Sequence, residues 1–220
     1  MYADAQDLHE QGTRVISTDE KTGIQALERK HETKGMKPGL VERREFEYTR
    51  HGTQCLIANF EVATGEMIAP TVSETRTEDD FVEHIVQTIE TDPSAAWVFI
   101  VDQLNTHKSE SLVLFVADLI EYEGDLGVKG KSGILKNMPT RAAFLSDESH
   151  WVRFVYTPKH TSWLNQIEIW FSILVRRLLK RASFTSKEEL KTRILKFIEY
   201  FNATMAKPFK WTYKGRPLQA

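Results

Sequence analysis

The chain has 220 residues, of which 41% are hydrophobic and 27% charged, and its formal net charge is −2. This length predicts one domain with a single core. The sequence contains neither a run of about eighteen apolar residues nor a charged-then-apolar leader, so it predicts neither a membrane span nor a signal peptide. The one cysteine, Cys55, excludes an internal disulfide and a cysteine-based zinc site.

The charge is unevenly divided along the chain. Residues 151–220 hold 14 Lys and Arg against 4 Asp and Glu, whereas residues 1–150 hold 15 against 27. A basic half beside a carboxylate cluster is typical of proteins whose cations hold a phosphate backbone next to a cutting site. The alternative is a solvated helix face that the acidic half balances.

The first half of the chain reads as strands and turns. A linker at 1–13 precedes a short strand at about 14–19 and a polar stretch that reaches Glu42. Turn signals then separate three extended segments, at 45–50, 54–62 and 67–73.

The second half alternates strands and helices. We expect a helix from the N-cap Thr77 to about Ile89, and afterwards the elements at 96–102 (strand), 107–120 (helix), 151–156 (strand), 163–181 (helix) and 186–202 (helix). A glycine-rich insertion at about 121–149 lies between the fourth and fifth core strands. This order predicts an α/β fold, a mixed sheet covered by helices on both faces.

Three acidic residues occupy positions that chemistry can use. Asp102 closes the apolar run 95–102, where an α/β sheet presents functional groups, although an acid there also ends strands without further purpose. Asp19 or Glu20 ends the first strand, and periodicity does not choose between them. Glu168 lies on the flank of the apolar stripe of 163–181, with no Lys or Arg three or four residues away. Such acids suit hard divalent ions, while a solvated rim position explains Glu168 equally well.

The residues around these acids resemble a known family. VDQLNTHKS at 101–109 and YTPKHTSWLNQIEIWFS at 156–172 closely resemble bacterial insertion-sequence transposases of the mariner superfamily, the DDE superfamily endonucleases. STDEKTGIQALER at 17–29 and the segment 184–218 are similar to that family as well. The resemblance implies a ribonuclease-H-like fold, DNA as substrate, and Asp19, Asp102 and Glu168 as the catalytic triad. It also implies that these three acids bind Mg²⁺ or Mn²⁺, as two ions.

Two departures from the family pattern stand out. The 65 residues between Asp102 and Glu168 exceed the usual spacing, and the insertion 121–149 accounts for the excess. Only thirteen residues precede the first strand, too few for a helix-turn-helix module, so we expect a catalytic domain alone, with a separate DNA-recognition module missing. GKS at 130–132 is no phosphate-binding P-loop, because Asp125 stands where that motif needs glycine.

We therefore predict a catalytic domain at 14–220 that cleaves and joins DNA strands by two-metal phosphoryl transfer. Its partners would be transposon ends, target DNA and a second copy in a homodimer, in the bacterial cytoplasm at the nucleoid. Weaker candidates for DNA contacts are Lys159, His160, Asn165, Arg176, Arg177 and Lys180. The alternatives are a stand-alone ribonuclease-H-like nuclease and a catalytically idle DNA-binding transposase remnant.

Overall fold

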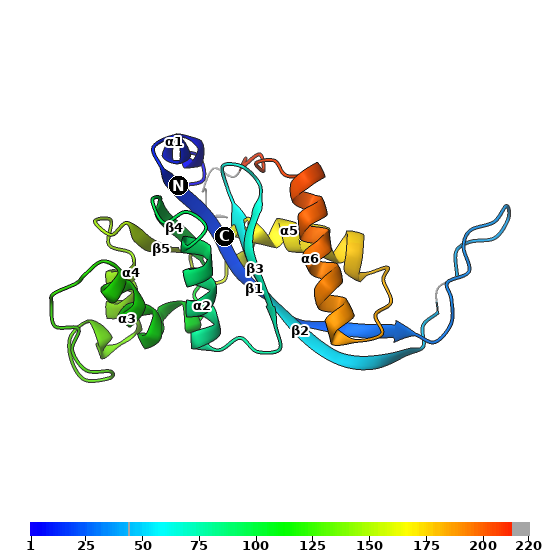
Figure 1. The fold of residues 1–220 in the computed structure, drawn as a ribbon, viewed down its shortest axis with the longest axis horizontal. Coiled ribbons are helices and arrows are strands. Elements are labelled where there is room, and N and C mark those ends of the chain that lie inside the picture. The colour runs from blue at the N-terminus through cyan, green and yellow to red at the C-terminus, as the bar shows by residue number, and fades with distance from the viewer. Residues whose placement is uncertain (44, 213–220) are drawn as a thin grey trace, which may run out of the picture.

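The computed structural model describes residues 1–43 and 45–212 and is built around one mixed sheet. Its five strands follow the order β3-β2-β1-β4-β5 (Figure 1). The strands are β1 (Thr13–Arg29), β2 (Tyr48–Glu61), β3 (Met67–Ser73), β4 (Ala96–Val101) and β5 (Val152–Tyr156). The first three pair antiparallel, whereas β4 and β5 run parallel to β1. The predicted mixed α/β sheet is confirmed.

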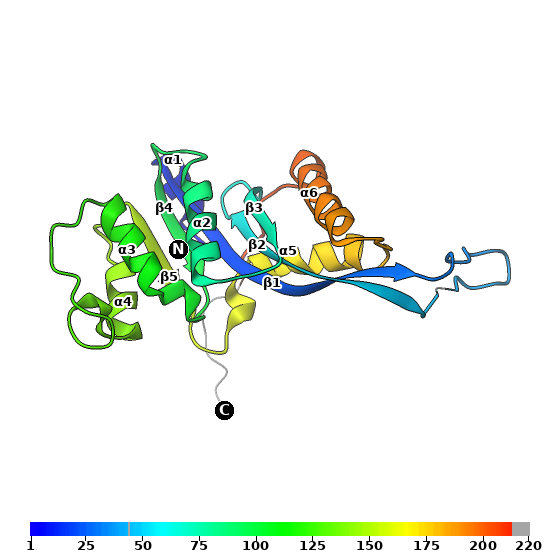
Figure 2. The same cartoon turned by 60° about the horizontal axis from the view of Figure 1, so that its bottom comes forward.

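Helices cover both faces of this sheet and close two separate cores. On one face lie α2 (Glu78–Ile89), α3 (Glu110–Leu119) and α4 (Met138–Leu145), and on the other α5 (Ile167–Leu174) and α6 (Lys187–Thr204) (Figures 1 and 2). Neighbouring residues of β2 divide between the cores: Ile57 packs with α2 and α3, while Leu56 packs with α5 and α6. This division follows from the alternation of side chains along a strand. In the described ranges no helix is long and apolar enough to cross a bilayer.

The segment before β1, expected to be a linker, contains the short helix α1 (Ala5–Glu10). Ala5 is buried there, in a small cluster with Val15, Val62 and Val98. The sequence of 1–13 does not predict this helix, because the segment is largely polar and Ala5 and Leu8 alone give too little apolar periodicity.

The first hairpin is much longer than expected. β1 was expected to end near residue 19, but it continues to Arg29 and pairs with β2, and together they form an arm that projects from the body (Figure 2). The turn expected at His51–Thr53 is instead a bulge inside β2, where the pairing slips between Gln25 and Leu27. Gly52 permits it with a φ of 110°.

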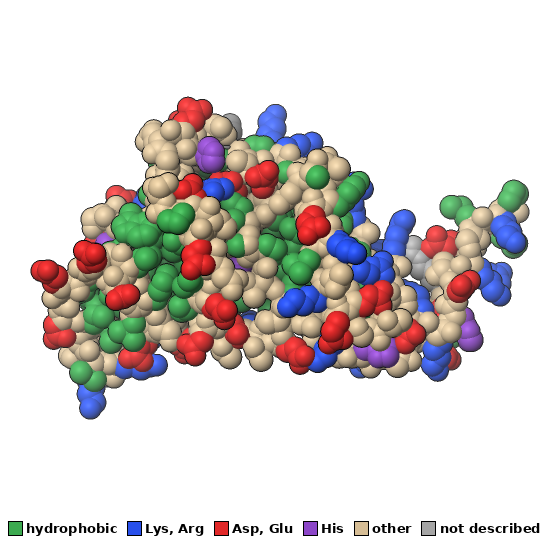
Figure 3. Space-filling view, in the orientation of Figure 1, with side chains coloured by type: hydrophobic (Ala, Val, Ile, Leu, Met, Phe, Trp, Pro, Cys, Tyr) green, Lys and Arg blue, Asp and Glu red, His purple; other side chains and the backbone are tan. Residues whose placement is uncertain are grey.

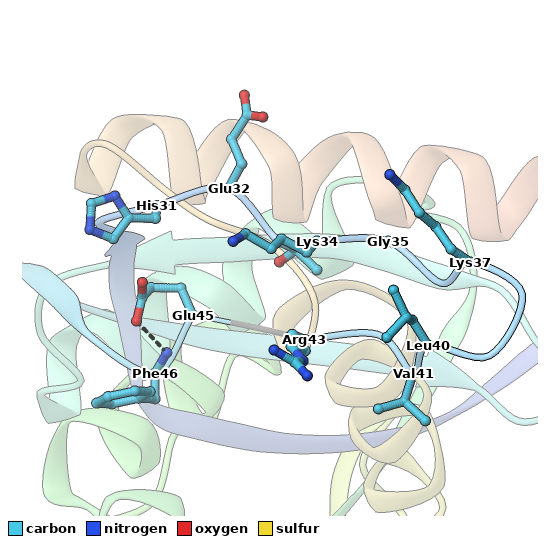
Figure 4. Close-up of a pocket in the computed structure, with 11 residues that line it drawn as sticks. His31, Glu32, Lys34, Gly35, Lys37, Leu40, Val41, Arg43, Glu45 and Phe46 are labelled. Carbon is cyan, nitrogen blue, oxygen red and sulfur yellow. Dashed lines mark hydrogen bonds between the residues drawn. The ribbon is translucent and has the colours of Figure 1, made fainter.

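The tip of the arm curls around a hollow of its own (Figure 4). Its lining includes Lys34, Lys37, Arg43 and the largely exposed Phe46, and Glu45 accepts a hydrogen bond from the Phe46 backbone N–H at 2.9 Å. All of these residues belong to the connection between β1 and β2. The hollow therefore lies apart from the body that carries the predicted acids.

The insertion 121–149 is ordered and packs on the body, as its apolar residues require. Its single-turn 3-10 helix (Ile134–Lys136) and α4 bury Leu135, Phe144 and Leu145 in the core beside α3. It does not cover the outer face of α5, and Ile169 on that face stays 39% exposed. Its apolar residues instead join the core cluster that contains Leu112, Val113 and Val116 of α3.

The helix expected at 163–181 has three parts. A 3-10 turn (Ser162–Leu164) comes first, then α5, and a π-helical stretch (Val175–Leu179) continues it. Trp170 and Leu174 of α5 are fully buried. The final helix α6 begins at the predicted cap, with the Ser186 hydroxyl accepting from the Glu189 backbone N–H at 3.0 Å.

Replacing Leu145 by alanine tests whether the insertion is part of the fold. Leu145 is fully buried, so Leu145→Ala should lower the free energy of unfolding by about 2–5 kcal/mol through lost burial and a residual cavity. Leu114→Ala on α3 is the matched control: Leu114 is 47% exposed, and its loss should cost under about 0.5 kcal/mol. Urea denaturation measures both, and equal small losses would show that the insertion does not support the core.

Candidate active site

The pairing of β1 with β4 sets the first two acids side by side. The last register pair aligns Ser17 with Ile100, and continuing it by two residues brings Asp19 level with Asp102. Adjacent strands lie about 4.8 Å apart. Two acids separated by more than eighty positions in sequence are thus neighbours at the end of β4 where a parallel strand presents functional groups.

The helix that carries Glu168 is tied to the same stretch of β1. The Asn165 side chain donates to the Thr18 carbonyl at 2.8 Å and approaches Asp19 Oδ2 at 3.5 Å. The Ser17 hydroxyl donates to Asn165 Oδ1 and accepts the Ile167 backbone N–H at 2.9 Å. Glu168 follows in the first turn of α5, so the third acid is delivered by a helix whose start is fixed to the strand of the first.

Asp19 is buried beside another negative charge. Its exposed fraction is 7%, and burial together with the charge of Asp102 raises its pKa to about 7. Glu20 adds repulsion, while the Glu20 backbone N–H, bonded to Asp19 Oδ1 at 2.8 Å, opposes the shift. A carboxyl group held in this way favours a proton or a bound cation over the free anion.

Asp102 is held in the opposite electrostatic state. Burial alone would raise its pKa, but hydrogen bonds from His107 and from the Leu104 backbone N–H outweigh burial and lower it. His107 lies between Asp102 Oδ1, at 2.9 Å, and Glu20 Oε1, at 3.2 Å. Burial opposes the charge of His107 too, yet these two carboxylates raise its pKa to about 9. Asp102 is therefore an anion with a fixed orientation.

The side chains of Asp19 and Glu20 point in different directions. Asp19 faces α5 through Asn165, whereas Glu20 faces the α2 side through His107, whose ring packs at a tilt against Phe81 with centroids 4.5 Å apart. Only Asp19 shares the side of the sheet on which α5 lies. The sequence does not reveal the bridging role of His107, because nothing in it places Glu20 beside this residue.

Glu168 lies half-buried in a shallow groove with Lys21, Phe171 and Arg176. Lys21 Nζ stands 5.7 Å above the Phe171 ring, so a cation of β1 lines the same groove as this carboxylate, which has no Lys or Arg three or four residues away on its own helix. In the described ranges no group of three His, Cys, Asp or Glu side chains is arranged as a ready metal site. Of the three predicted acids, Asp19 and Asp102 are the two that the sheet register sets side by side, and Glu168 lies in the groove on α5.

The residues named for DNA contacts divide into exposed and buried ones. Exposed side chains are those of Lys159, His160, Arg176, Arg177 and Lys180. Asn165 is fully buried and bonded to β1, so its expected role in DNA contact is wrong and its role is to anchor α5. Figure 3 shows Lys and Arg gathered over α6 and the arm, and Asp and Glu spread over the half with α2 to α4.

Substituting Asp19 tests the electrostatics of this pair. The folded state raises the pKa of Asp19 from 3.8 to about 7, because it disfavours the anion. The free energy of unfolding of the protein should therefore fall as the pH rises from about 4 to 7. Asp19→Asn should therefore raise metal-free stability at pH 8 by on the order of 2–4 kcal/mol and flatten its slope between pH 4 and 7. Thermal unfolding against pH measures this, with Asp79→Asn, an exposed acid of α2, as control. A slope that survives in Asp19→Asn would refute the raised pKa.

The fold of the chain resembles that of solved transposase structures. A search of curated protein sequences found no match. The solved structures that resemble the chain include the Mos1 transposase paired-end complex with left transposon end (12% identity, TM-score 0.52), the Mos1 mariner paired-end complex with Mn (13%, 0.53) and a pre-cleavage Mos1 transpososome (13%, 0.51).

These structures share the ribonuclease-H-like fold that was expected, which is thereby confirmed. The alignments cover 90%, 92% and 95% of this chain but only 54%, 57% and 62% of the respective Mos1 chains, so the chain spans little more than half their length. A family model for the DDE superfamily endonuclease matches residues 14–191. The chain belongs to the DDE superfamily endonuclease family.

Proposed function

We propose that this chain is the catalytic domain of a DNA transposase, which cleaves DNA strands and joins them by metal-dependent phosphoryl transfer. One observation carries the proposal: β1 sets Asp19 beside Asp102, and the same strand anchors the helix of Glu168. The solved structures of similar fold are transposase complexes with a transposon end or with Mn. We propose the same activity for this chain.

The donor set fits a hard divalent cation such as Mg²⁺ or Mn²⁺. Carboxylate oxygens are the ligands such ions prefer, and the raised pKa of Asp19 reflects a negative pair that a cation would neutralise. We assign Asp19, Asp102 and Glu168 as ligands. Two bound ions would activate the attacking water or 3′-hydroxyl and stabilise the leaving oxygen.

The chain's own residues prepare this reaction. Asp102 is oriented and ionised by its hydrogen bonds, Asp19 would release its proton when it binds a cation, and Asn165 keeps the α5 helix against β1. Exposed Lys159 and His160 follow β5, and Arg176, Arg177 and Lys180 extend from Glu168 along its helix. These side chains would contact the DNA backbone on either side of the acids, the Lys and Arg among them as cations.

The proposal includes partners beyond DNA. A homodimer would bring two such sites to two transposon ends, a separate module would supply sequence recognition, and the protein would act at the bacterial nucleoid. A stand-alone nuclease would use the same acids and cut without joining, and an idle remnant would bind DNA without cutting. The cleaved and the joined products, measured together, therefore distinguish the three activities.

Glu168→Gln tests the catalytic assignment. The amide keeps the shape of the side chain but removes its charge, so Mg²⁺- or Mn²⁺-dependent cleavage of transposon-end DNA should fall at least about 100-fold with stability unchanged or improved. Glu199→Gln, an exposed acid of α6, is the matched control and should cut normally. Gel assays of cleavage and strand transfer measure both steps, and a Glu168→Gln protein that still cuts would make that carboxylate structural.

A charge-removal triple tests the DNA surface. Arg176→Gln, Arg177→Gln and Lys180→Gln together should weaken DNA binding and reduce the slope of log affinity against log salt by roughly 2 to 3, about one per lost phosphate contact. The comparison protein carries Lys129→Gln, Lys131→Gln and Lys136→Gln, which remove the same charge from exposed positions of the insertion. Fluorescence anisotropy at several salt concentrations measures both slopes. Equal slopes would mean that net charge, not this helix, governs binding.

A further inference from the structure

We propose that His107 is a positioning residue that fixes Asp102 for ion binding through a buried Glu20–His107–Asp102 bridge. The inference rests on the proposed function, since it concerns how one of the assigned ligands is oriented. It assigns no contact between His107 and the DNA or the ion.

The bridge leaves one oxygen of Asp102 committed and the other available. Oδ1 accepts from the Leu104 backbone N–H at 2.8 Å and meets His107 Nδ1 at 2.9 Å. No residue of the described ranges donates a hydrogen bond to Oδ2, and the Asp102 side chain is 31% exposed. Two donors on one oxygen fix the carboxylate plane and direct Oδ2 away from the protein donors.

His107 is itself held from every side. The residue is fully buried, its ring packs at a tilt against Phe81, and its backbone carbonyl accepts from the Tyr156 hydroxyl at 2.8 Å. Its Nε2 meets Glu20 Oε1 at 3.2 Å, and the Glu20 side chain is 2% exposed. Carboxylates only accept hydrogen bonds when ionised, so both ring nitrogens donate. The imidazole cannot rotate without breaking one of these bonds.

The bridge also links the two neighbouring acids through one strand. Asp19 and Glu20 are consecutive in β1 and point to opposite faces. Asp19 reaches the site directly, whereas Glu20 reaches Asp102 through His107. The position of β1 thus sets both the location of Asp19 and the orientation of Asp102. In metal sites, ligating carboxylates are commonly oriented in this way by hydrogen-bond partners behind them.

A merely structural histidine would fill space against Phe81, and two isosteric variants separate these roles. In His107→Asn the amide nitrogen takes the place of Nδ1 and can still donate to Asp102. In His107→Gln the amide reaches the place of Nε2, beside Glu20, and loses Asp102. Gln is the closer match in size, so a space-filling role would favour Gln and a positioning role favours Asn.

The experiment measures Mn²⁺ affinity of the full chain by electron paramagnetic resonance, without DNA, and the Mg²⁺ concentration for half-maximal cleavage. His107→Gln should weaken Mn²⁺ binding about 10- to 100-fold, the usual effect of losing a partner behind a ligand, and His107→Asn by less than about threefold. His84→Gln is the control: His84 is another fully buried histidine, bonded to Thr71 at 2.8 Å, and its loss should leave Mn²⁺ affinity unchanged.

Equal Mn²⁺ affinities for the Asn and Gln variants, or a greater loss in Asn, would overturn the inference. If both unfold, Glu20→Ala, which releases Nε2, should weaken Mn²⁺ binding at least about threefold, and an unchanged affinity would overturn it instead. If the variants bind Mn²⁺ in the expected order but the wild-type protein never cuts DNA, the bridge is supported and the proposed function is contradicted.

Discussion

The parallel pairing of β1 with β4 is the constraint on which the candidate site depends. Its register brings Asp19 level with Asp102, and no other contact between these parts of the chain is needed to make them neighbours. The same strand carries Ser17, which anchors the start of α5, and Glu20, which meets the His107 ring. A one-residue slip of β1 would turn Asp19 to the other face and break all three connections.

The hydrogen-bond network around β1 explains how the protein tolerates buried carboxyl groups. Glu20 and Asp102 share a buried imidazolium, so their charges are compensated within the fold. In the described part of the chain no cationic side chain bonds to Asp19 in this way, and burial together with the charge of Asp102 raises its pKa. Glu20 and Asp102 are thus stabilised by the fold itself, whereas Asp19 would be stabilised by a bound cation. This contrast makes Asp19 the member of the Asp19–Asp102 pair that most favours a ligand.

Two additions to the core sheet leave this network intact. The insertion 121–149 attaches to α3 through Leu135, Phe144 and Leu145, on the face away from α5. The arm of β1 and β2 extends the sheet outward beyond Lys21. Both are built on connections whose ends the sheet already holds, so they change the outline of the molecule without moving the acids.

The sequence by itself determined the element types from Thr77 onward, the mixed sheet, the family, and Asp102 and Glu168 as notable acids, because apolar periodicity and the motifs at 101–109 and 156–172 are local signals. Tertiary structure decided what depends on pairing between distant segments. Asp19 was separated from Glu20 by the faces of β1, Asn165 proved to be an internal anchor, and His107 proved to be a bridge. The length of β1 likewise came from its pairing with β2, since polar residues such as Lys21 and Thr22 form a strand only when a partner satisfies their backbone groups.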